Sequence, residues 1–99
     1  MILIAGTFTI QAEDREVAVA AMAEMMAETA KEEGCVSYDM TSSFDDPTTI
    51  HLFEEWESEE HLQAHFEAPH MAVLQKVMMS IGPVERNIHK YVATDKSPL

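Results

Sequence analysis

Positive charge is scarce in this chain. Its 99 residues include 6 lysines and arginines against 18 aspartates and glutamates, for a formal net charge of −12. Nucleic acids and anionic lipid surfaces are bound through Lys and Arg side chains that displace counterions. We therefore expect neither nucleic-acid nor membrane-surface binding, and we interpret the acid excess as an aid to solubility.

The chain has only one cysteine and no long apolar run. The single cysteine, Cys35, cannot form an internal disulfide, and we interpret it as a buried thiol rather than a nucleophile. No apolar run approaches the ~20 residues that cross a bilayer, and no basic segment precedes the apolar N-terminus. These features predict a cytoplasmic protein without a transmembrane segment.

Glycine occurs only three times, and no G-x-G-x-x-G loop is present, so the sequence does not support a nucleotide cofactor. The length fits one domain over residues 1–99 with a modest core. The last residues, 93–99, are polar, and we expect them to be flexible.

The pattern of apolar residues predicts four strands and two helical regions. Alternation at period two indicates strands at 2–10, 35–43, 49–56 and 84–92. In the second strand it places Val36, Tyr38 and Met40 on one face. Apolar residues spaced three and four apart indicate a helix over 14–33, ended by Gly34, whose apolar side includes Val17. Ser58 is a good N-cap for a helix from 59 to about 67, and a further helix follows Pro69 and closes near Gly82.

The resulting order, βαββαβ, predicts an α+β ferredoxin-like fold with a four-stranded antiparallel sheet and its helices on one face. Leu3, Ala5, Phe53 and Tyr91 lie on the strand phases opposite to the other apolar positions. Both faces of the sheet are therefore apolar, and a chain this short has no third layer to cover the second face. We expect a homodimer whose two sheets face each other.

Several segments together resemble the antibiotic biosynthesis monooxygenase family. They are GCVSYDM at 34–40, DDPTTIHLFEEWESEEHL at 45–62 and HFEAPHM at 65–71. No single motif is diagnostic, and their joint spacing with the strand order carries the resemblance over nearly all of 2–92. The resemblance implies a dimeric α+β barrel protein that oxygenates a small phenol or quinol with O2, without metal or flavin.

Such a reaction needs an apolar pocket and a base with a pKa near neutrality, and histidine is the usual base. The match to the family favours His65 and His70 as the catalytic residues. Without a matching motif, we expect His61 to face solvent. A metal site built from the three histidines lacks the Glu placement of the His-Glu-x-x-His zinc signature, so we expect no metal.

Tyr38, Trp56 and Glu54 are the candidate substrate-binding residues. Each aromatic side chain combines a large apolar body with one polar donor, so core packing and contact with substrate are both open. Glu54 shares a strand face with Trp56, where an unpaired carboxylate is costly. We expect an ion pair with Arg86, and the orientation of a histidine is the alternative.

Three other functions are weighed against this one. In the haem-degrading branch of the family, the positions that carry its Asn, Trp and His correspond here to Thr7, His65 and Gln75, and none matches. An isomerase of phosphorylated substrates would need basic residues that the first 67 positions mostly lack. The remaining alternative is a non-catalytic small-molecule-binding or stress-associated dimer of the same fold.

Overall fold

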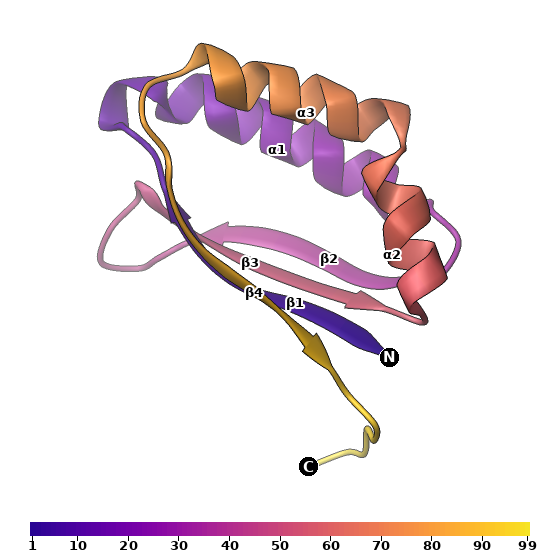
Figure 1. Cartoon of the computed structure of the whole chain (residues 1–99). Helices are drawn as coiled ribbons and strands as arrows, with labels where there is room; N and C mark the ends of the chain where they lie inside the picture. The colour runs from indigo at the N-terminus through magenta and orange to yellow at the C-terminus, as the bar shows by residue number, and fades with distance from the viewer.

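Four antiparallel strands form one sheet, and all the helices lie on the same face of it (Figure 1). The computed structural model describes all residues, 1–99. The elements in chain order are β1 (Ile2–Thr9), the 3-10 helix η1 (Ala12–Asp14), α1 (Arg15–Thr29), β2 (Cys35–Ser42), β3 (Thr49–Trp56), α2 (Glu59–Phe66), α3 (Pro69–Ser80) and β4 (Glu85–Val92). The strand order β2-β3-β1-β4 confirms the predicted ferredoxin-like fold.

The core lies between the sheet and the helices. Even-numbered residues of β1 point to the helices, and Ile2, Ile4 and Phe8 are all buried. Trp56 at the end of β3 and Leu62 in α2 are almost completely buried as well. The period-two pattern therefore identified the inner face of β1 correctly.

The first helix is shorter than the predicted 14–33. After Thr29 the helical pattern gives way to turns, in which Lys31 and Glu32 donate their backbone N–H groups to carbonyls three residues earlier. Gly34, at φ 80°, ends this turn rather than the helix itself. Val17, which we expected on the buried side of the helix, is 55% exposed.

A β-bulge at the start of β2 makes the prediction that Val36 shares a face with Tyr38 and Met40 wrong. Cys35 pairs with Trp56 and Ser37 pairs with Glu55, so Val36 is an extra residue on this strand. The bulge shifts the phase of the strand, which leaves Val36 exposed while Tyr38 and Met40 are buried. Period-two alternation cannot reveal such an insertion.

Helix α3 differs from α1 and α2 because none of its residues is buried. Its apolar side chains, among them Met71, Leu74 and Met78, are only partly covered against the core. Ser58 caps α2 as predicted, since its hydroxyl accepts the backbone N–H of His61. No helix of the chain combines the length and apolarity that a bilayer span requires.

The other face of the sheet has no cover within the chain (Figure 1). Phe53 is 43% exposed and Tyr91 is 52% exposed, and Leu3 is only partly buried. This is the surface on which we propose that a second copy of the chain packs.

Replacement of Phe53 by Glu would place a charge in that interface. We expect the wild-type chain, at micromolar concentration, to give twice the 11.1 kDa monomer mass in light scattering, and Phe53→Glu to give the monomer mass. Phe44→Glu is the control, because Phe44 lies fully exposed in the turn between β2 and β3. A wild-type chain that is monomeric at this concentration would rule the dimer out.

Candidate functional site

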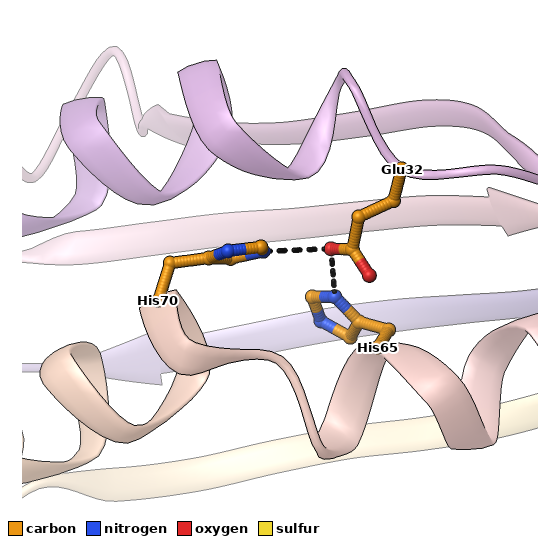
Figure 2. A group of neighbouring side chains, drawn as sticks. All are labelled: Glu32, His65 and His70. Atoms are coloured by element: carbon orange, nitrogen blue, oxygen red, sulfur yellow. Dashed lines mark hydrogen bonds and ion pairs between the residues drawn. The ribbon is translucent and has the colours of Figure 1, made fainter.

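Two histidines share one carboxylate oxygen (Figure 2). Glu32 lies in the turn between α1 and β2, His65 in α2 and His70 in the first turn of α3. The Oε2 atom of Glu32 is 2.7 Å from Nδ1 of His65 and 2.7 Å from Nε2 of His70. Two consecutive helices and a turn more than 30 residues earlier in the chain therefore meet at one atom.

The ring of His65 is completely buried among aromatic side chains. Its centroid lies 4.8 Å from that of Trp56 and 5.4 Å from that of Tyr38. Because a carboxylate oxygen accepts hydrogen bonds, Nδ1 of His65 donates to Glu32, and Nε2 is left as an acceptor. Nε2 is buried and has no hydrogen-bond partner in the chain.

Glu32, His65 and His70 are also the residues that could hold a metal ion. Their donor atoms, one carboxylate oxygen and two imidazole nitrogens, lie within 4.8 Å of one another, and zinc accepts such a donor set. Binding through Nδ1 of His65 would move the ring proton to Nε2, where it would find no acceptor. The surroundings of His65 therefore fit a hydrogen-bonded carboxylate better than a metal ligand set.

His61 does not face solvent as expected. Its side chain is 29% exposed, and its Nδ1 atom lies 2.8 Å from the Ser58 hydroxyl. The ring also packs closely on Gly34, where an added Cβ would come within 2.1 Å of the ring. His61 thus closes the turn before β2 instead of joining His65 and His70.

A cavity of about 430 Å³ lies between the sheet and helices α2 and α3. This volume is within the range of small-molecule sites. The lining is mostly apolar, and the apolar side chains come from the inner face of the sheet and from both helices: Ile4, Phe8, Met40, Leu52, Leu62, Phe66, Met71, Leu74, Met78 and Ile88. The space lies below α3, the helix that buries none of its own residues.

Two polar side chains of the sheet, Tyr38 and Glu54, line this cavity next to each other. They are cross-strand partners on β2 and β3, which places their side chains on the same face. One oxygen of the Glu54 carboxyl, Oε1, accepts the indole N–H of Trp56 at 2.8 Å. The Tyr38 hydroxyl makes no hydrogen bond within the chain, so it is free to donate into the cavity.

Burial determines the protonation of both groups. It raises the pKa of Glu54 from the ordinary 4.5 to about 7, although the hydrogen bond from Trp56 acts in the opposite direction. Burial also raises the pKa of Tyr38, and the nearby carboxylates of Glu54 and Glu32 add to this increase. The cavity therefore contains a carboxyl group that titrates near neutrality beside a phenol that stays protonated.

The predicted ion pair between Glu54 and Arg86 does not form. Glu54 is paired with the Trp56 indole instead, and Arg86 has neither an ion pair nor a hydrogen bond in the chain. In the register of the sheet, the β1 neighbour of Glu54 is Ile4, whereas Arg86 is opposite Phe8. The two charges are therefore four positions apart along β1.

The five predicted site residues thus divide into two groups. Tyr38 and Glu54 line the large cavity, whereas His65, His70 and Trp56 do not. His65 lies behind Tyr38, on the side of the ring cluster nearer to Glu32. The part that the histidines play in any reaction stays a prediction.

The haem-degrading arrangement is not assembled here. Gln75 lines the cavity, but Thr7 is on an odd-numbered position of β1 and points to the opposite face of the sheet.

Sequence reasoning missed Glu32. The helix predicted over 14–33 included this residue, although it lies in the turn after α1. Its position two residues before Gly34 could have indicated a turn instead of a helix. A residue in a turn that leads into β2 can point toward the helices that pack on the sheet, here α2 and α3. Arg86 was noted, but as a partner of Glu54 and not as a free cation at the cavity.

The sheet order and the cavity under α2 and α3 define an α+β ferredoxin-like protein with a largely apolar cavity that opens to solvent. The sequence model of the family described as antibiotic biosynthesis monooxygenase matches residues 1–77. The chain belongs to the antibiotic biosynthesis monooxygenase family.

Solved structures share the fold over nearly their whole length. A proposed antibiotic biosynthesis monooxygenase from Deinococcus radiodurans has a TM-score of 0.87 at 18% identity, covering 100% of this chain and 98% of that one. A second such protein, from Nitrosomonas europaea, has a TM-score of 0.83 at 20% identity and covers 94% and 98% of the two chains.

A third structure is a conserved protein of unknown function from Bacteroides thetaiotaomicron, described as a possible oxidoreductase. It has a TM-score of 0.80 at 27% identity, with 91% of this chain and 94% of that chain covered. No curated protein matches the chain.

Loss of the Glu32 carboxylate would leave the buried Nδ1–H of His65 without an acceptor. We expect Glu32→Ala to lower the free energy of unfolding by about 2 kcal/mol in urea titrations. The neighbouring Glu33→Ala is the control, since the Glu33 side chain is 93% exposed, and it should change stability little. Equal effects of the two substitutions would contradict the role assigned to Glu32.

The raised pKa of Glu54 predicts a pH dependence of stability. Because the folded chain holds this proton more tightly than the unfolded chain, the stabilisation is complete below pH 4.5 and is lost as the pH rises through about 7. The loss should be on the order of 3 kcal/mol, and Glu54→Gln should abolish it. Urea unfolding at pH 5 and pH 8 measures the change in the free energy of unfolding. Glu16→Gln, at an exposed position of α1, is the control and should show the same change as the wild type. Parallel pH profiles of the wild type and Glu54→Gln would contradict it.

Proposed function

We propose that this protein is a cofactor-independent monooxygenase that oxidises a small aromatic quinol or phenol with molecular oxygen. The observation that carries the proposal is the juxtaposition of Glu54 and Tyr38 on the wall of an otherwise largely apolar cavity of about 430 Å³. Membership of the antibiotic biosynthesis monooxygenase family supports the reaction class. The names given to the Deinococcus and Nitrosomonas relatives agree with it.

The chemistry requires little from the protein beyond proton transfer and a dry site. Ground-state oxygen is a triplet and reacts slowly with closed-shell organic molecules, so the substrate itself must become a good electron donor. Deprotonation of a phenolic hydroxyl achieves this. An apolar chamber then strengthens the few electrostatic contacts that hold the resulting anion.

Glu54 is the proposed general base. Its carboxyl group lines the cavity, where a substrate hydroxyl can reach it, and Trp56 fixes its orientation by donating to Oε1. A group that titrates near pH 7 is well matched to this role, because it is partly ionised at neutral pH and still basic enough to take a proton.

Tyr38 is the proposed donor to the substrate anion. Its hydroxyl has no partner in the chain and stays protonated, so it can donate a hydrogen bond to the phenolate oxygen as charge develops there. For a hydroquinone, the overall reaction consumes one O2 and yields a hydroxyquinone and one water; for a phenol with a free para position, it yields a quinone and one water. The carbon gains one oxygen atom, and the second leaves as water.

His65 is the alternative base, as the resemblance to the family implies. Glu32 holds its Nδ1–H and leaves Nε2 as an acceptor, an arrangement that resembles the oriented histidine of hydrolase triads. However, Nε2 is buried behind Tyr38 and does not line the cavity. A substrate could meet it only after the aromatic cluster moves, and we therefore rank Glu54 first.

Oxygen uptake with a panel of neutral hydroquinones, phenylhydroquinone among them, tests the proposal. We expect wild-type kcat/KM to rise with pH through about 7 as Glu54 ionises. Glu54→Gln should lower kcat/KM about 100-fold and abolish its increase with pH. Glu57→Gln, an exposed acid just after β3, is the control and should behave as the wild type.

The same assay decides between the two bases. If uptake survives in Glu54→Gln but is lost in His65→Ala, the base is the histidine. Saturable binding of the quinols without oxygen uptake in the wild type would instead indicate a non-catalytic binding protein and would refute the monooxygenase.

A further inference from the structure

The cavity has a charge balance unlike that of the rest of the chain. Two of the 6 basic side chains line it, Arg86 and Lys90, together with only two of the 18 acids, Glu54 and Glu59. The chain as a whole carries a net charge of −12 and repels anions. The lining of the cavity is thus balanced in formal charge, unlike the strongly acidic chain around it.

Only one of these cations is free. Lys90 forms an ion pair with Glu59 at 3.0 Å, so their charges largely cancel. Arg86 makes no ion pair and no hydrogen bond, in contrast to Arg15, which donates to a backbone carbonyl and to a serine hydroxyl. Arg86 is exposed to solvent at the edge of the cavity, and its guanidinium has five donors that no group of the chain occupies, so it is available to bind an anion there.

Arg86 and Glu54 lie at opposite ends of the cavity. On β1, the strand between them, their register partners are Phe8 and Ile4, which are four residues apart, a rise of roughly 13 Å along the strand. The positions between the two ends are apolar, with Leu52 on β3 among them. The chamber therefore has a proton-accepting end, an apolar middle and a cationic end.

We propose that the cavity binds an elongated aromatic acid, with a phenol or quinol hydroxyl at Glu54 and Tyr38 and a carboxylate at Arg86. The reaction at the hydroxyl end rests on the proposed function, whereas the anchoring of the carboxylate does not. The planar guanidinium can donate two parallel hydrogen bonds to a carboxylate, and a neutral ester or amide cannot accept them in the same way. Arg86 then sets specificity, because a phenol without the acid fills the apolar middle but leaves this cation unpaired.

A matched pair of quinols tests the anchor directly. The acid is 2′,5′-dihydroxybiphenyl-4-carboxylate, whose hydroquinone ring and carboxylate lie at opposite ends of a biphenyl body, and the comparison is its methyl ester. Calorimetric titration under nitrogen measures binding without oxidation. We expect the wild type to bind the acid at least about tenfold more tightly than the ester.

Arg86→Gln should raise the Kd of the acid at least about tenfold and leave the Kd of the ester unchanged. Arg86→Lys should restore part of the loss, because it keeps the charge but not the paired donors. Lys76→Gln is the matched control, since Lys76 is the other cation with neither an ion pair nor a hydrogen bond in the chain and it does not line the cavity. This control should bind both compounds as the wild type does.

Equal affinity of the wild type for acid and ester, no binding of either, or an Arg86→Gln variant that is folded by circular dichroism and loses both ligands alike would overturn the proposal. Oxygen uptake with the ester is measured separately. It tests the proposed monooxygenase activity and not the binding of a carboxylate at Arg86. If neither compound is oxidised but the acid still binds in an Arg86-dependent way, the proposed function fails and the carboxylate site stands.

Discussion

The shared oxygen of Glu32 is the contact on which the arrangement of the helices depends. His65 is completely buried, and a buried imidazole N–H without an acceptor would be costly, so its bond to Glu32 has to form for α2 to pack on the sheet. The same oxygen accepts from His70 and thereby fixes the start of α3. The chain bends between α2 and α3 just before Pro69 (Figure 1), and this pair of hydrogen bonds holds both sides of the bend to one carboxylate.

The cavity is a consequence of how α3 is held. Its N-terminal end is tied to Glu32, and its apolar side chains face the sheet without reaching full burial. A chain of 99 residues has few side chains with which to fill the remaining space. The floor of that space holds Glu54, a carboxyl group whose only partner in the chain is the indole of Trp56, and the low polarity around it explains its high pKa.

The regular part of the fold could be predicted from the sequence because it depends on local periodicity. The strands and their order followed from alternation at period two, and the cap of α2 followed from Ser58. The bulge at Val36 and the early end of α1 could not be predicted, since both depend on pairings with β3 and on turn geometry. The same holds for the site. The candidate histidines, aromatic residues and Glu54 were identified from the sequence, but Glu32 contacts the histidines only through tertiary packing. Equally, the sequence predicted Arg86 as the partner of Glu54, with a histidine as the alternative, and only the register, which places Arg86 opposite Phe8, shows why the indole of Trp56 is the partner instead.

Because α3 buries no side chain of its own, it is the least firmly anchored wall of the chamber. Displacing it by a small distance would expose no fully buried side chain of its own, whereas a similar displacement of α1 would open the tightly packed region around Met22 and Met25. Molecules of different thickness would thus be accommodated by the tilt of a single helix, hinged near Pro69 and faced with pliable thioether side chains, while the sheet that carries the reactive groups stays rigid.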